Sequence, residues 1–67
     1  MNLRDSWLLT GATQADVYRI IEKLFKRYAI TFSTLKEHLK PGVRALPEPR
    51  TLAQINRAFA EIRKENE

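Results

Sequence analysis

One apolar stripe constrains the fold of this chain more than any other feature. Between residues 13 and 29, apolar side chains recur at steps of three and four residues, a spacing that places them on one face of an α-helix. Thr13 and Asp16 have the spacing of a capping box at the start of this segment. The pattern predicts a helix over 13–29. The stripe consists of Val17, Ile20, Ile21, Leu24 and Tyr28, with Phe25 on its flank.

Three further segments are predicted to be helical, so the expected fold class is all-α, a small three- to four-helix domain. The second of these helices is expected to begin at Ser33 or Thr34. Thr51 and Gln54 match the S/T-x-x-E/Q capping box, which predicts the start of the last helix. The expected ranges of the three helices are 3–9, 33–39 and 51–64.

Residues 40–50 are expected to form the one long loop of a single domain over 1–67. This segment holds all three prolines of the chain, and each proline biases the residue before it toward extended geometry. Val43 and Leu46 are the apolar residues expected to attach the loop to the core. Residues 65–67 are expected to form a frayed tail.

The composition excludes several sources of stability and chemistry. The chain has 67 residues, no cysteine and one histidine, which excludes disulfides and thiolate metal sites and leaves no cluster of metal ligands. We therefore expect no cofactor. His38 has no nucleophile motif beside it, so an enzyme is not expected. A chain this short often gains stability from a partner subunit, which makes a homodimer the expected assembly.

The net charge of +4 is concentrated in the middle of the chain. From Arg19 to Arg57 there are nine cations and three acids, whereas both ends are slightly acidic. Basic charge in a small protein favours nucleic acid, an anionic membrane or an acidic partner. The alternative interpretation is that Lys and Arg only keep a small helical protein in solution.

Membrane insertion and secretion are not expected from this sequence. No apolar run approaches the roughly 20 residues that a membrane helix needs. The first residues, MNLRDSWLLTGA, include an acid and only a short apolar run, so they do not form a signal-peptide pattern. We expect a soluble, cytoplasmic protein.

The segment GATQADVYRII resembles the recognition half of helix-turn-helix DNA-binding domains. It has a glycine, a small apolar residue, Thr and Gln, then Val and a polar pair before an aliphatic residue. The resemblance covers residues 3–22 and departs from the family pattern at Ser6, Trp7 and Thr10. It implies a small DNA-binding transcription regulator of bacterial or phage type, with double-stranded DNA as its partner.

The same resemblance implies which side chains meet the DNA. Gln14 lies where it can pair with adenine, and Arg19 where it can reach a guanine edge or a phosphate. The remaining cations add backbone contacts. The implied nucleic-acid-binding residues are Thr13, Gln14, Arg19, Lys23, Lys26 and Arg27. The structural alternative is a capped core helix whose outer face is merely solvated.

Two other placements of a DNA-binding surface are open. The helices over 33–39 and 51–64 could form the DNA-binding pair, although the loop between them is longer than the usual turn. In that case Gln54, Asn56 and Arg57 are expected to be exposed near the start of the last helix. Alternatively, that loop contacts phosphates itself through Lys40, Arg44 and Arg50.

The competing class is a protein-protein interaction module, an adaptor or inhibitor of a larger protein that also self-associates. Aromatic residues are common anchors of such interfaces. A DNA-binding protein should expose its polar contact residues on one convex face, whereas an interaction module should expose a sizeable apolar patch. The candidate interface residues are Trp7, Leu8, Leu9, Tyr18, Phe25 and Tyr28.

Overall fold

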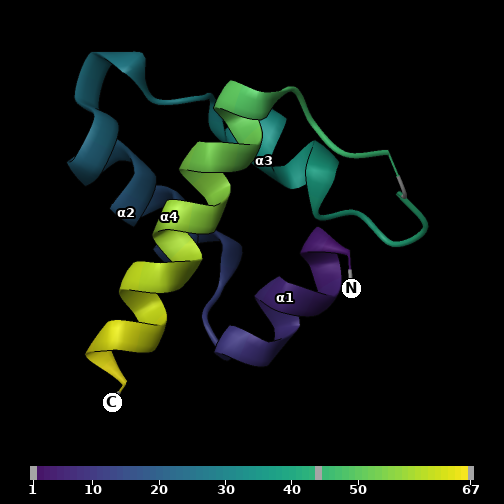
Figure 1. Cartoon of the computed structure of the whole chain (residues 1–67), viewed down its shortest axis with the longest axis horizontal. Coiled ribbons are helices and arrows are strands. Elements are labelled where there is room, and N and C mark those ends of the chain that lie inside the picture. Colours follow the sequence, from purple (N-terminus) through teal and green to yellow (C-terminus); the bar gives the residue numbers. More distant parts are fainter. Residues whose placement is uncertain (1, 44, 67) are drawn as a thin grey trace.

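The computed structural model describes residues 2–43 and 45–66, and within these residues the fold is all-α, as predicted. In Figure 1, α4 runs diagonally across the molecule, with α2 on its left and α1 on its right. Helices α1 and α2 each pack chiefly against α4. The helices are α1 (Leu3–Thr10), α2 (Gln14–Phe25), the short 3-10 helix η1 (Lys26–Tyr28), α3 (Phe32–His38) and α4 (Pro49–Glu65).

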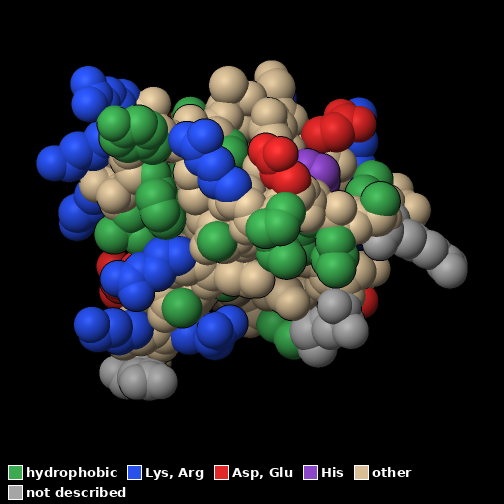
Figure 2. Space-filling view, turned by 45° about the horizontal axis from the view of Figure 1, so that its top comes forward, with side chains coloured by type: hydrophobic (Ala, Val, Ile, Leu, Met, Phe, Trp, Pro, Cys, Tyr) green, Lys and Arg blue, Asp and Glu red, His purple; other side chains and the backbone are tan. Residues whose placement is uncertain are grey.

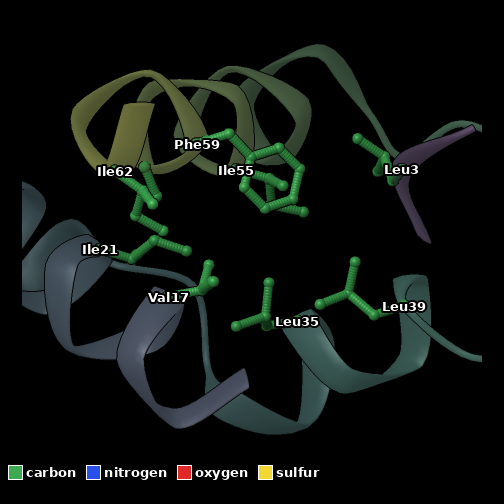
Figure 3. Packing of buried hydrophobic residues seen from close by; sticks show 9 residues of the cluster. Leu3, Val17, Ile21, Leu35, Leu39, Ile55, Phe59 and Ile62 are labelled. Atoms are coloured by element: carbon green, nitrogen blue, oxygen red, sulfur yellow. The ribbon is translucent and has the colours of Figure 1, made fainter. Parts of the chain in front are cut away.

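The core lies between α4 on one side and α2 with α3 on the other (Figure 3). Phe59 is its largest fully buried side chain, and Leu3 of α1 closes one end. Burying apolar side chains of this size is the main favourable contribution to folding. The other fully buried large side chains are Val17, Ile21, Leu35, Leu39 and Ile55.

Side-chain caps define where two of the shorter helices begin. The hydroxyl of Thr13 accepts a hydrogen bond from the backbone N–H of Asp16 at 3.1 Å, which confirms the cap predicted for α2. The cap of α3 is Thr31, whose hydroxyl accepts from the N–H of Thr34 at 3.1 Å. The expected start at Ser33 or Thr34 was therefore wrong, because a suitable hydroxyl occurs earlier.

The helix predicted over 13–29 ends early, at Phe25. Lys26 follows with φ 52° and ψ −121°, and it is the one non-glycine residue with positive φ among residues 2–43 and 45–66. Such a conformation costs on the order of 1–3 kcal/mol for a residue with a Cβ. The apolar periodicity did not reveal this break, because Tyr28 has helical spacing but a side chain that is mostly exposed.

The cause of the break lies in α4. Gln54 is 3% exposed, and its Nε2 donates to the carbonyl oxygen of Tyr28 at 2.8 Å. Its Oε1 accepts from the N–H of Ile30 at 2.9 Å. One buried amide thus satisfies two backbone groups that a continued helix would have used internally.

The capping box predicted at Thr51 and Gln54 is wrong, because α4 begins earlier, at Pro49. Glu48 is the N-cap residue, and a proline in the first turn suits a helix because its missing N–H has no partner to lose there. Thr51 and Gln54 are both buried and face the rest of the molecule, so the expectation that Gln54 is exposed was wrong. Thr51 and Gln54 match the capping-box motif, but the helix already begins at Pro49, two residues before Thr51.

The connection between α3 and α4 is a loop, as expected, although it ends at Glu48. Pro47 is buried and Val43 half-buried, whereas Leu46 is 67% exposed, so Leu46 does not attach the loop to the core. Within the tail expected over 65–67, Glu65 belongs to α4 and Asn66 caps it. The tail residue Glu67 and the proposed phosphate contact Arg44 lie outside the described residues.

Candidate nucleic-acid interface

The segment that resembles a helix-turn-helix has the expected order of elements. Gly11 ends α1 with φ 72°, a left-handed conformation that glycine adopts without steric cost. Ala12 and Thr13 complete a three-residue turn, and α2 begins at Gln14. The two helices are therefore joined by a turn of helix-turn-helix length, while both rest on α4.

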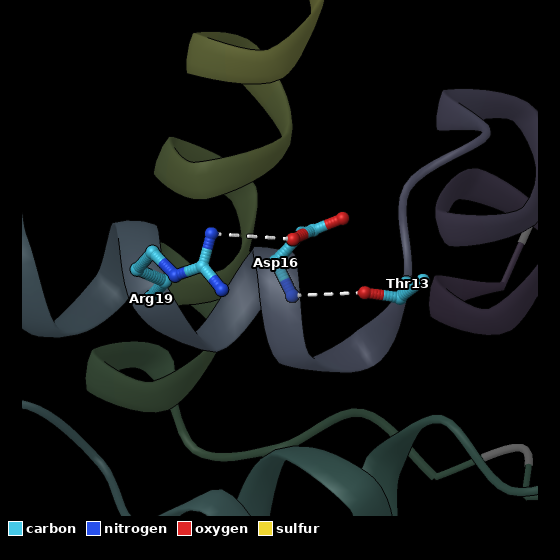
Figure 4. Close-up of polar contacts among 3 residues, drawn as sticks. All are labelled: Thr13, Asp16 and Arg19. Carbon is cyan, nitrogen blue, oxygen red and sulfur yellow. Dashed lines mark hydrogen bonds and ion pairs between the residues drawn. The ribbon is translucent and has the colours of Figure 1, made fainter.

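The start of α2 presents Thr13, Asp16 and Arg19 on one side of the helix (Figure 4). The Thr13 hydroxyl is engaged as the cap, and Gln14 is half-buried. Arg19 Nη1 lies 3.6 Å from Oδ1 of Asp16, with 78% of the Arg19 side chain exposed. Exposed pairs of this kind contribute little to stability, so the guanidinium remains available to another anion.

A groove of about 410 Å³ lies between the start of α2 and the end of α4. Arg19 and Lys23 border it from α2, Ile20 and Ile62 are apolar residues in its lining, and Glu65 borders it from α4. The surface beside the two cations is therefore concave, unlike the convex face expected for a DNA-reading helix.

Lys26 and Arg27 continue the series of cationic side chains beyond the end of α2. Both are exposed, and both belong to η1 because the helix breaks at Phe25. Arg27 is held against Tyr28: its Nη2 donates to the phenolic oxygen at 3.0 Å, and its guanidinium lies 5.1 Å from the ring centroid. The break of the helix at Phe25 therefore determines the direction in which the side chains of Lys26 and Arg27 extend.

Figure 2 shows Lys and Arg side chains along the left side of the molecule, the side that carries α2, η1 and the end of α4. We define the basic face as the four exposed cations of α2 and η1. Glu22 is an exposed acid on the same helix. The basic face consists of Arg19, Lys23, Lys26 and Arg27.

Most cations of the basic face have no carboxylate partner within residues 2–43 and 45–66. Three ion pairs occur among the described residues: Asp16–Arg19, Glu37–Lys40 and Glu61–Arg57. A hydrogen bond from Lys40 lowers the pKa of the Glu37 carboxyl below its ordinary value, and the Lys40 charge acts in the same direction. Three of the basic-face residues, Lys23, Lys26 and Arg27, take part in none of these pairs.

Arg50 and Tyr28 form a contact that the sequence did not predict. Arg50 was assigned to the loop, but it lies in the first turn of α4, where its Nη2 donates to the carbonyl oxygen of Tyr28 at 3.3 Å. The position of Arg50 four residues before Gln54 places both side chains on one face of a helix, and that spacing was the available signal.

The residues proposed for a protein interface divide into two groups. Trp7, Tyr18 and Phe25 are half-buried against the core, and the Tyr18 ring stacks on Phe32 with 5.2 Å between centroids. Leu8 and Leu9 are 53% and 75% exposed on α1. The remaining candidate of that set is Tyr28, 58% exposed, on η1.

No protein-family model, curated protein or solved structure matches this chain. None of the helices in the described part of the chain is both long and apolar enough to cross a membrane. Across residues 2–43 and 45–66, no three His, Cys, Asp or Glu side chains come together as a set of metal ligands.

Proposed function

We propose that the protein is a small DNA-binding regulator that binds double-stranded DNA through its basic face. The observation that carries this proposal is the row of exposed cations on α2 and η1, three of which have no carboxylate partner among the described residues. Phosphate contacts from Lys and Arg supply most of the affinity of such proteins for a duplex and fix their orientation on it.

The helix-turn-helix arrangement is part of the proposal. In it, α2 approaches the duplex from its N-terminal half, Arg19 and Lys23 bind phosphates, and Gln14 is the side chain that can read adenine. Thr13 supports this arrangement as the cap of α2 rather than by contacting a base. The proposed site of action is the cytoplasm.

Fluorescence anisotropy with a labelled duplex tests the proposal. Four phosphate contacts imply a fall in affinity of roughly 10²-fold between about 50 and 200 mM salt. Because the double variant Lys23→Ala/Lys26→Ala loses two of these contacts, its slope of log affinity against log salt should fall by about 2 units.

A matched control has the same loss of charge on another helix surface. The double variant Lys36→Ala/Lys40→Ala removes two cations at and beyond the end of α3 and should retain the affinity and salt slope of the original chain. Absence of binding at the lower salt concentration, or equal losses in the two double variants, would refute the proposal.

The second candidate is a protein-protein interaction module that self-associates through α1. The exposure of Leu8 and Leu9 on α1 favours it, because these two leucines are the apolar side chains of that helix that a partner would cover. Sedimentation equilibrium tests it: the original chain should be a dimer at micromolar concentration, and Leu9→Asp should make it monomeric. A monomer in both cases would exclude the homodimer.

A further inference from the structure

Tyr28 is an aromatic residue whose side chain lies outside the hydrophobic core. It is 58% exposed, whereas each of the other five aromatic residues of the chain is at least half-buried. Its backbone is nevertheless fixed, since its carbonyl oxygen accepts from Gln54 at 2.8 Å and from Arg50 at 3.3 Å. An exposed ring on a fixed backbone loses little conformational freedom when it binds a ligand.

One cationic side chain lies beside the backbone carbonyl of Tyr28, and another lies beside its phenolic hydroxyl. Arg50 is bonded to its carbonyl oxygen, and Arg27 is bonded to its phenolic oxygen and lies over its ring. A nucleotide has the complementary arrangement, a flat base with a phosphate on either side along the strand. Aromatic rings beside cationic side chains are the usual means by which proteins bind unpaired bases.

A pocket of about 310 Å³ lies beside Tyr28, at the end of the basic face. Thr31 and Thr34, whose hydroxyls are hydrogen-bonded to each other, line it together with Ile30, Arg50 and the acidic residue Glu48. A carboxylate repels a phosphate but accepts hydrogen bonds from the amino groups of a base. The lining therefore favours a base in the pocket, with the phosphates outside it near the arginines.

We propose that Tyr28 and this pocket bind an unpaired base, so that the protein prefers a DNA duplex carrying a single-stranded extension to a blunt duplex. Inside a duplex both faces of each base are covered by its neighbours, and a terminal base is held by its pairing partner, so the base that enters the pocket is an unpaired one. This inference rests on the proposed DNA binding, in which the duplex lies on the basic face and the extension passes Tyr28.

The test compares a blunt duplex with the same duplex bearing a short single-stranded extension, by anisotropy at one salt concentration. The extension should raise the affinity of the original chain on the order of tenfold, the gain expected for stacking one base. Tyr28→Leu should lose this gain, measured as the ratio of its affinities for the two DNAs, because release of Arg27 from the ring also changes the affinity for the blunt duplex. Tyr28→Phe retains the ring and should keep the gain, and thermal melts verify that both variants are folded.

The outcomes separate this inference from the proposed function. Equal affinity for the two DNAs would refute the base-binding pocket and leave duplex binding intact. A gain that survives in Tyr28→Leu would place the extension elsewhere and also refute it. Binding to neither DNA would overturn both proposals.

Discussion

Gln54 holds the backbone of Tyr28 in place: the Nε2 of Gln54 donates to the Tyr28 carbonyl oxygen at 2.8 Å. The same amide accepts from Ile30, so a single side chain of α4 fixes the path of the chain after α2. The position of η1, and with it the direction of two of the four cations of the basic face, depends on this contact.

Replacing Gln54 should therefore destabilise the fold. Gln54→Leu removes both hydrogen bonds and leaves a backbone carbonyl and an N–H without these partners, at an expected cost of about 2–3 kcal/mol. Urea denaturation followed by circular dichroism measures it. Asn56→Ala, an exposed change on the same helix, is the control and should stay within about 0.5 kcal/mol of the original chain. An unchanged stability in Gln54→Leu would contradict the role of this amide.

Lys26→Gly should make the protein more stable. Relief of the positive φ should gain about 1–3 kcal/mol, of which the greater freedom of glycine in the unfolded chain should offset about 1 kcal/mol. Lys26→Ala removes the same charge and keeps the strain, so it should show no such gain. Both variants should weaken DNA binding equally if Lys26 contacts a phosphate. A Lys26→Gly variant that is about 1 kcal/mol less stable than Lys26→Ala, which is the cost of glycine freedom alone, would show that Lys26 is not strained.

Thr13→Ala should destabilise α2 by about 1 kcal/mol through loss of its cap. Thr13→Ser keeps a hydroxyl at the same position and should retain most of the stability. Thermal melts of the two variants measure the difference. A loss of the same size in both would mean that the methyl group of Thr13, rather than its hydroxyl, stabilises the start of the helix.

Phe59→Ala should have the largest effect among these single changes. The ring is fully buried between α4 and the facing helices, and truncating such a residue costs about 3–5 kcal/mol. Leu9→Ala is the control, because its side chain is 75% exposed and its loss should change the stability by less than about 0.5 kcal/mol. A large loss in Leu9→Ala would indicate that α1 is covered in solution, as the self-association candidate requires.

The sequence was sufficient to locate the helices, but it did not show which residues at the start of α4 are buried against the rest of the chain. Periodicity located α2 and α4 because it reports which face of a helix is apolar, as at Val17 and Ile55. Thr51 and Gln54 matched a local capping motif, yet both are buried by contacts with distant parts of the chain. A local motif carries no information about such contacts.

The candidate site was also only partly predictable from the sequence. The exposure of Arg19 and Lys23 follows from their position opposite the apolar stripe. The pairing of Arg50 with Tyr28 does not, because it joins residues 22 positions apart and needs the packing of α4 on α2. The concave shape beside Arg19 likewise depends on where the end of α4 lies.

The positive φ of Lys26 also has a consequence for motion. Strain at this residue is balanced by hydrogen bonds from α4 rather than by apolar burial, since none of the η1 residues is buried. Local opening of such a corner needs less free energy than unfolding of the core. The amide hydrogens of Ala29 and Ile30 should therefore exchange with solvent faster than those of Ile21 and Phe59.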